Sequence, residues 1–189
     1  DYSKNIAFFG ERHYDVVVTV GSSLGDLTVD AAAMYPETDF IGVEQFQENP
    51  VDGVAGLIFP EEDAGFLAGA LGAMMSTNHT IGAICGPEWL PSMQRYGEGF
   101  KTGAGYADEQ TGTSTKAIVI YQEAGRQEFA DAEQAINTAK SLTDQGVDVL
   151  FSCEGATGDT VLIAAAQSGA FVVGVDADQY YTLPEASAR

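Results

Sequence analysis

Residues 147–179, VDVLFSCEGATGDTVLIAAAQSGAFVVGVDADQ, decide the fold class of this 189-residue chain. They contain two apolar runs, at 147–153 and 171–176, separated by a helical pattern over 157–168. Apolar strands on either side of a helix are typical of a parallel sheet that helices cover on both faces. Because such crossovers are right-handed, the stretch predicts an α/β fold with a doubly wound, Rossmann-like architecture.

The same alternation extends along the rest of the chain, which is expected to enter its first strand almost at once. Further strands are predicted at 14–21, 39–45, 54–59, 80–86 and 116–122, and helices at 23–36, 61–76, 91–108 and 129–145.

Two separate sheets are predicted, because the stretch NPVDGVAGLIFPEED (49–63) is typical of an extended connection between two lobes. We therefore expect a partial first α/β lobe over 1–59 and a second α/β lobe over 60–176. A crossover segment over 177–189 would return toward the first lobe. Ligands of open α/β sheets bind at the carboxyl ends of the strands, and lobes joined by crossing segments close as hinges. The prediction is thus a ligand held between two lobes.

The charge balance limits the partners of the protein. It has 28 acidic residues against eight Lys and Arg, for a net charge of -20. Such a surface repels phosphate backbones and anionic lipid, so no nucleic-acid partner is expected. It suits a neutral or cationic ligand, a salty habitat or a surface tuned for solubility. No apolar run reaches the roughly 18 to 20 residues that span a bilayer.

Two features of the sequence concern processing and redox state. The chain has no initiating Met, so we expect a processed or incomplete chain whose missing signals do not indicate a compartment. Cys85 and Cys153 lie near the ends of predicted buried strands. They are interpreted as small core hydrophobes, which leaves the redox compartment open.

The segments that follow the strands carry hydrogen-bonding groups and aromatic rings rather than catalytic groups. Carboxylates accept hydrogen bonds from sugar hydroxyls, and aromatic faces stack on sugars or bases. The alternative is structural: Asp176 would cap a strand-end turn, and Phe129 would belong to the core. The candidates are Ser22, Ser23, Trp89, Phe129, Thr157, Asp176, Asp178 and Gln179.

Enzymatic and cofactor chemistry is not expected. His13 and His79 precede strands, so they lie at the end of the sheet opposite these segments. The pair Asp176 and Asp178 is too small a set for a metal site. The run GATGDT (155–160) opens a helix and suits an anion, but it lacks the lysine of a nucleotide phosphate loop. We therefore predict no catalytic residue, no metal and no cofactor.

Three motifs resemble the basic membrane protein family. They are FPEEDAGFLAGALGAMMS (59–76), GPEWLPSMQRYGEGFKTGAGY (86–106) and the stretch from 144 to 179, which ends in GVDADQ. The resemblance extends from about residue 14 to the C-terminus, with the motifs in the family's order. It implies the two-lobed type I periplasmic-binding fold and a substrate-binding lipoprotein of an ABC importer.

The resemblance also implies roles for individual residues. Asp176 would accept the ribose hydroxyls of a nucleoside, purine-type by preference, and Phe129 would stack on its base. Gly155 would line the sugar side, and Ser22 and Ser23 would contribute from the first lobe.

This sequence departs from the family pattern in several places. The family's first strand, with its D-x-x-F-N-like loop, is absent, as is the segment after GVDxDQ that carries a ligand-binding lysine. A few extra residues separate Tyr121 from Phe129, and Trp89 stands where the family has a polar residue. Trp89 therefore replaces or supplements a stacking face in this interpretation.

The leading hypothesis is an extracytoplasmic solute-binding protein, lipid-anchored in its full-length form, that is not an enzyme. It would close on a nucleoside-like solute and deliver it to a membrane permease. Two alternatives stay open. One is a ligand-sensing ectodomain or regulator with the same fold, and the other is an α/β enzyme that processes nucleosides or sugars.

Overall fold

A computed structural model describes residues 1–122, 132–153 and 156–187. The chain divides into two compact units, Asp1–Phe59 and Pro60–Arg189, here called the first and the second unit. Each unit has its own parallel sheet, so the predicted α/β class with two parallel sheets is confirmed. The units are described one at a time.

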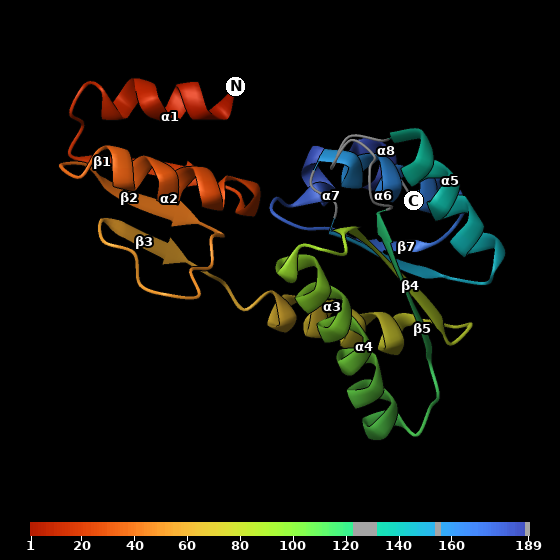
Figure 1. The fold of residues 1–189 in the computed structure, drawn as a ribbon. Coiled ribbons are helices and arrows are strands. Elements are labelled where there is room, and N and C mark those ends of the chain that lie inside the picture. The colour runs from red at the N-terminus through yellow and green to blue at the C-terminus, as the bar shows by residue number, and fades with distance from the viewer. Residues whose placement is uncertain (123–131, 154–155, 188–189) are drawn as a thin grey trace. The chain divides into compact units, whose positions relative to one another are not determined.

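The first unit is a three-stranded parallel sheet in the order β1-β2-β3 with helices on one face. Its elements are α1 (Tyr2–Gly10), β1 (Val16–Val20), the 3-10 turn η1 (Ser22–Leu24), α2 (Gly25–Met34), β2 (Asp39–Val43) and β3 (Val54–Leu57). Helices α1 and α2 lie on the same side of this sheet (Figure 1), and Ile6 of α1 and Ala31 of α2 form a buried cluster with Val17 and Phe40. The other face of β1 is exposed.

Helix α1 contradicts the expectation that the chain enters a strand almost at once. Only Ile6 and Gly10 of this helix are buried, and its 9 residues are fewer than the roughly 11 to 18 over which a helical apolar pattern is read. Gly10 is required by packing, because a side chain there would overlap the ring of Tyr35. Tertiary contact with α2 therefore holds α1.

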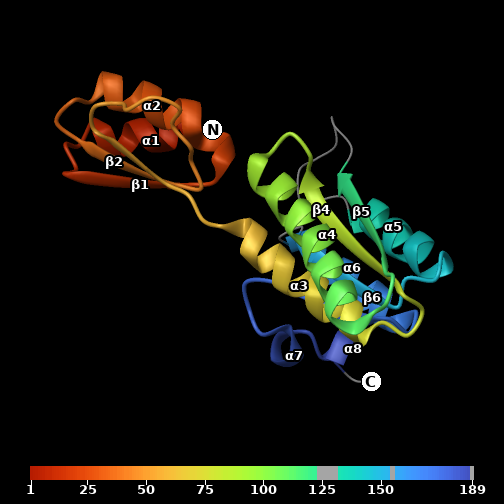
Figure 2. The same ribbon diagram turned by 90° about the horizontal axis from the view of Figure 1, so that it is seen from below.

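The second unit is a four-stranded parallel sheet in the order β5-β4-β6-β7 with helices on both faces. Figures 1 and 2 show α3 and α4 on one side and α5 and α6 on the other. Its elements are α3 (Glu61–Met75), β4 (Thr80–Pro87), α4 (Pro91–Thr111), β5 (Lys116–Gln122), α5 (Ala132–Asp144), β6 (Val149–Cys153), α6 (Ala156–Gln167), β7 (Phe171–Val173), α7 (Gln179–Thr182) and α8 (Pro184–Ser187).

Glycine lets α3 and α4 approach closely over the first of these faces. A side chain at Gly69 would overlap the carbonyl of Phe100, and one at Gly103 would overlap the carbonyl of Phe66. Phe100 then stacks on Phe151 of β6 with ring centroids 5.8 Å apart. The FLAGALG pattern of the sequence is thus a helix-packing motif.

The C-terminal end of the second unit differs in detail from the prediction. The strand predicted at 171–176 ends at Val173, and two short helices, α7 and α8, follow it. Residues 177–187 belong to the second unit. The return of 177–189 toward a first lobe stays a prediction.

Cys85 and Cys153 form a disulfide, which corrects their interpretation as unbonded core residues. They are paired positions on the adjacent parallel strands β4 and β6, with their Cα atoms 4.8 Å apart. Both are buried, as predicted, but their sequence separation of 68 hides the pairing from the sequence. Only the sheet register brings the two sulfur atoms together.

Candidate functional site

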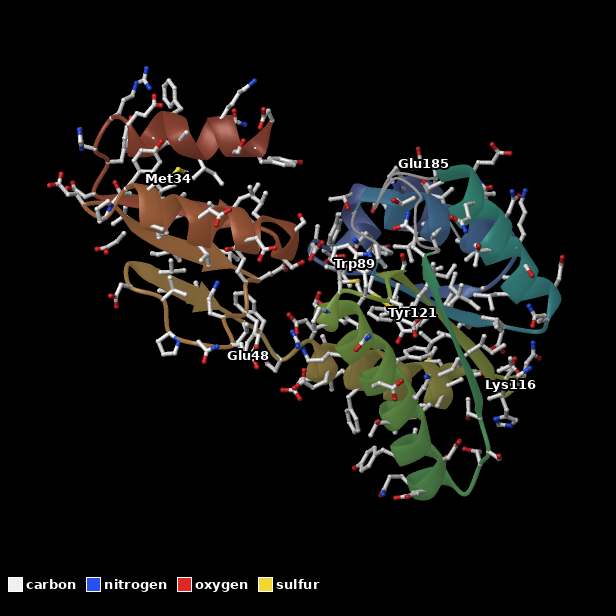
Figure 3. The ribbon with its side chains drawn as sticks, in the orientation of Figure 1. Met34, Glu48, Trp89, Lys116, Tyr121 and Glu185 are labelled. Atoms are coloured by element: carbon white, nitrogen blue, oxygen red, sulfur yellow. A yellow bond between two sulfur atoms is a disulfide. The ribbon has the colours of Figure 1, made fainter. Side chains whose placement is uncertain are left out.

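The carboxyl ends of β4, β5, β6 and β7 meet at one edge of the second sheet, because all four strands are parallel. In Figure 3, Trp89 lies toward this edge, whereas Lys116 marks the opposite end, where β5 begins. The segments after β4, β6 and β7 carry Trp89, Thr157 and Asp176. The sheet order therefore gathers three of the predicted binding residues at one edge, on neighbouring strands.

Trp89 is exposed to solvent on a turn that hydrogen bonds and a buried neighbouring side chain hold in place. Its neighbour Leu90 is buried and donates its backbone N–H to the carbonyl of Pro87 at 3.1 Å. Gln94 Nε2 donates to the carbonyl of Glu88 at 2.8 Å. The Trp89 side chain itself is 54% exposed. An exposed indole on a fixed turn is suited to stacking on a planar ligand.

Two buried hydroxyls lie where β6 passes into α6. Ser152 and Thr157 are 1% and 6% exposed, and neither hydroxyl has a hydrogen-bond partner among the described residues. Gly158 approaches Ser152 so closely that a Cβ there would lie 2.8 Å from its Oγ atom. Unpartnered buried hydroxyls are uncommon, and they lie beside helix N–H groups that also lack intrahelical partners. Ser152 was not predicted; a polar residue in the apolar run VLFSC was the available signal.

Asp176 and Asp178 have different environments. Asp176 is exposed and has a left-handed backbone with φ of 68°, which is uncommon for a residue other than Gly and turns the chain away from β7. Asp178 is the N-cap of α7 and accepts a hydrogen bond from the Tyr180 N–H at 3.1 Å. The structural alternative raised for Asp176 thus applies to Asp178, whose carboxylate caps a helix.

Asp178 also lines a groove along the outer edge of β7. The groove has a volume of about 540 Å³ and a largely apolar lining. Leu71 of α3, Phe171 of β7 and Tyr180 of α7 contribute to it. The groove is therefore separate in character from the polar strand-end segments.

Phe129 and Gly155 lie outside the residues that the structure describes. Their predicted roles, stacking on a base and lining the sugar side, stay predictions. Tyr121, at the end of β5, is described, and its hydroxyl lies against Gly97 of α4. Burial raises the pKa of Tyr121 although the charge of Lys101 lowers it, so the phenol is neutral at pH 7.

An ion pair fixes the start of α3 against α4 in the second unit. Arg95 Nε donates to Glu61 Oε2 at 2.6 Å, and Glu61 is buried. The hydrogen bond that Arg95 donates to Glu61 raises the pKa of Arg95, against the opposing effect of burial. The pair holds the first turn of α3, which follows Pro60.

In the first unit, Ser22 and Ser23 form the turn that follows β1. Ser23 is exposed and Ser22 is half-buried. The backbone below them is held by Gln45, whose Nε2 donates to Gly21 O at 3.1 Å and to Thr19 Oγ1 at 3.0 Å.

Gln45 is a buried residue that the prediction missed. It is 2% exposed, and its Oε1 atom has no hydrogen-bond partner among the described residues. Its side chain covers Gly42, where any Cβ would overlap it. It also lines a cavity of about 400 Å³, with Gln47 and Asn49. Its position directly after an apolar strand, as for Ser22, was the signal available in the sequence.

Metal and membrane sites are not evident in the described parts of the chain. No group of three or more His, Cys, Asp or Glu side chains there is arranged to hold a metal ion. Among the described helices, none combines the length and apolarity that crossing a membrane requires.

The known proteins that are similar to this chain are longer than it. An uncharacterized lipoprotein of Pyrococcus abyssi is 28% identical over 187 residues, covering 92% of this chain and 44% of that protein. The ABC transporter nucleoside-binding protein BmpA of Lactococcus lactis is 27% identical over 189 residues, covering 96% of this chain and 51% of that protein. The chain thus spans about half the length of these relatives.

The solved structures agree with the sequence relatives. An ABC transporter solute-binding protein of Aeropyrum pernix K1 superimposes with a TM-score of 0.85 at 26% identity, covering 96% of this chain and 51% of that one. Residues 1–188 match the family described as ABC transporter substrate-binding protein PnrA-like. The strand-end segments, the two parallel sheets and these similarities lead to one conclusion: the chain belongs to the PnrA-like family of ABC transporter substrate-binding proteins, in agreement with the basic membrane protein resemblance.

Proposed function

We propose that the complete protein is the extracytoplasmic binding component of an ABC importer and captures a nucleoside or a similar sugar-containing solute. The observation that carries the proposal is the gathering of Trp89, Thr157 and Asp176 at one edge of the second sheet. These groups supply an aromatic face, a hydroxyl and a carboxylate, which match a base and the hydroxyls of a ribose. The name of the Lactococcus lactis relative, a nucleoside-binding protein, favours the same ligand class.

In this proposal the ligand lies between two lobes that close on it. The second unit supplies Trp89, Thr157 and Asp176, and the first unit supplies Ser22 and Ser23; Phe129 and Gly155 keep the roles that the family resemblance implies. Closure removes the ligand from water, and reopening at the permease releases it. No covalent step is involved, so the protein is not an enzyme.

The location is supported by the disulfide and by the relatives. A disulfide between Cys85 and Cys153 persists in oxidising compartments. Relatives of similar sequence are named as lipoproteins. A lipid-anchored protein outside the cytoplasmic membrane, in contact with an ABC permease, fits both observations.

The test is isothermal titration of the complete protein with adenosine, guanosine, inosine, cytidine, ribose and adenine. We expect nucleosides to bind more tightly than ribose or adenine alone, because each half of the ligand contributes. Asp176→Asn should weaken nucleoside binding by about tenfold or more, through the loss of charge-assisted hydrogen bonds. The matched control is Asp144→Asn, which removes an exposed charge at the end of α5.

Two outcomes would contradict the proposal. Failure of all six compounds to bind removes the nucleoside assignment. Equal weakening by Asp176→Asn and Asp144→Asn shows that net charge, rather than the strand-end carboxylate, governs binding. Uptake of labelled nucleoside by cells with and without the gene then separates an importer component from a sensor with the same fold.

A further inference from the structure

The disulfide joins the two central strands of the second sheet where their pairing ends. Cys85 and Cys153 are the last paired positions of β4 and β6. Directly after Cys85, the register of β4 against β5 shifts. After Cys153 the chain leaves the sheet and soon enters α6. The covalent bond thus lies where the backbone ladder stops holding the two strands together.

The two segments that follow the disulfide carry groups of the proposed binding site. Trp89 lies in the turn shortly after Cys85, and Thr157 lies in the first turn of α6 shortly after Cys153. Each segment continues from one of the two bonded strands, and its own hydrogen bonds or helix packing then hold it further along the chain. The Cys85–Cys153 bond therefore holds together the two strand ends from which the segments of Trp89 and Thr157 begin.

The disulfide is enclosed in the packed interior. Cys85 and Cys153 are 0% and 4% exposed and belong to the core on the α3 and α4 face, together with Phe100 and Phe151. A bond shielded in this way is a permanent constraint, because a reductant reaches it only when the core opens. The bond therefore acts as a fixed constraint on the two strand ends, and it does not respond to changes in the redox potential of the solution while the protein is folded.

We propose that the Cys85–Cys153 disulfide is a positioning element of the binding site. It keeps the turn at 86–90 and the start of α6 at a fixed separation, so that Trp89 and Thr157 are in place before the ligand arrives. Pre-ordering of this kind strengthens binding because less conformational freedom is lost when the ligand binds. The effect on binding rests on the proposed function, whereas the effect on the two segments does not.

The first test measures amide hydrogen exchange in three forms of the complete protein. These forms are the oxidised wild type, the wild type refolded in reductant, and the double variant Cys85→Ala and Cys153→Ala. The reduced wild type keeps both sulfur atoms, so it controls for the volume that the alanines remove.

We expect exchange of the Leu90 amide, which donates to Pro87 O, and of the amides at 160–162, the first in α6 with intrahelical partners, to be about tenfold faster or more in both forms without the bond, because these segments then open locally. Exchange at the amino-proximal strand positions Ile81 and Val149 should be unchanged. An equal increase at all of these positions indicates only a loss of global stability and overturns the proposal. No increase at Leu90 or at 160–162 overturns it as well.

A further measurement applies if the forms without the bond do not fold. In the oxidised wild type, the Leu90 amide should then exchange only with global unfolding, at the same apparent free energy as Leu150 in the middle of β6. Exchange of Leu90 by local opening in the oxidised protein would show that the bond does not hold the turn, and the proposal would fail.

The second test measures nucleoside binding to the same three forms, with adenosine, guanosine and cytidine as probes. We expect the affinity to fall about tenfold in both forms without the bond. Equal affinity in all forms, with loosened segments, overturns the link between positioning and binding. If no nucleoside binds even the oxidised form, the proposed function fails, and the exchange data alone decide whether the bond positions the two segments.

Discussion

The strands β1 and β6 have similarly apolar sequences but very different surroundings. In β6, VLFSC, all five residues are buried, because helices cover both faces of the second sheet. In β1, VVVTV, burial alternates, and Val16, Val18 and Val20 are 48%, 56% and 64% exposed. An apolar strand sequence therefore indicates that both faces could be buried. Whether both are buried depends on the helices that pack on the sheet. The second unit has a complete two-sided core, and the first unit has one face covered.

The largest effect is expected from a large-to-small change in the two-sided core. Phe100→Ala should lower the free energy of unfolding of the second unit by about 3–5 kcal/mol, because it removes a buried ring that stacks on Phe151. Urea unfolding followed by Trp89 fluorescence checks this value, since the single tryptophan lies in the second unit. A cost below about 1 kcal/mol would show that this core is loosely packed and would remove the contrast with the first sheet.

The close approach of α3 and α4 should give the next largest effect. Gly103→Ala should cost about 2–3 kcal/mol, because the new methyl group overlaps the backbone carbonyl of Phe66. Gly105→Ala, two residues away on the same helix, has no atom within 4 Å of the added carbon. It should stabilise the second unit by about 0.5–1 kcal/mol through helix propensity. Similar results from both variants would contradict the tight helix contact.

A half-buried hydrogen-bond cluster at the amino end of the second sheet should make this unit sensitive to acid. Asp148 accepts hydrogen bonds from Ser76 Oγ at 2.5 Å, from the Thr77 N–H at 2.7 Å and from the Asn78 N–H at 2.9 Å. Burial alone would raise the pKa of Asp148, but these hydrogen bonds outweigh it and hold the pKa below its ordinary value.

Because the folded-state pKa is depressed, the stabilisation by Asp148 is present above the pKa of the unfolded chain, about 3.9. It is lost as the pH falls through the folded-state value. Asp148→Asn should cost about 1–2 kcal/mol at pH 7 and progressively less at lower pH. Urea unfolding between neutral pH and pH 3 checks the slope. A cost that is the same at every pH would mean that the carboxylate charge is not the cause.

The smallest effect is expected on the open face of the first sheet. Val18→Thr should change the stability of the chain 1–189 by at most about 0.5 kcal/mol, because the side chain is exposed. Val17→Thr on the covered face should cost about 1–3 kcal/mol, since it buries a hydroxyl group. Exchange of the Phe40 amide reports on this sheet. The comparison is sharpened by repeating Val18→Thr in the complete protein: a cost equal to that of Val17→Thr would show that this face is covered there.

The residues of the candidate site illustrate what could be predicted and why the rest could not. Trp89, Thr157 and Asp176 follow strands of one parallel sheet, so their common edge follows from the parallel direction of the strands, whereas only the structure shows that β4, β6 and β7 are neighbours. Asp178 was predicted as a ligand group, but its carboxylate caps α7, which depends on the backbone of residues 178–180. Gln45 was missed because its importance lies in folding back over Gly42 and Gly21, a contact that strand periodicity does not record.

By itself, the sequence determined the alternation of strands and helices, the two-sheet α/β class and the family, because these depend on local apolar patterns and on motifs read in order along the chain. The tertiary structure decided the pairing of Cys85 with Cys153, the packing that forms α1, and the uneven cover of the two sheets. Each of these depends on contacts between segments far apart in the chain, whose free energy appears only once the strands are in register and the helices lie on a particular face.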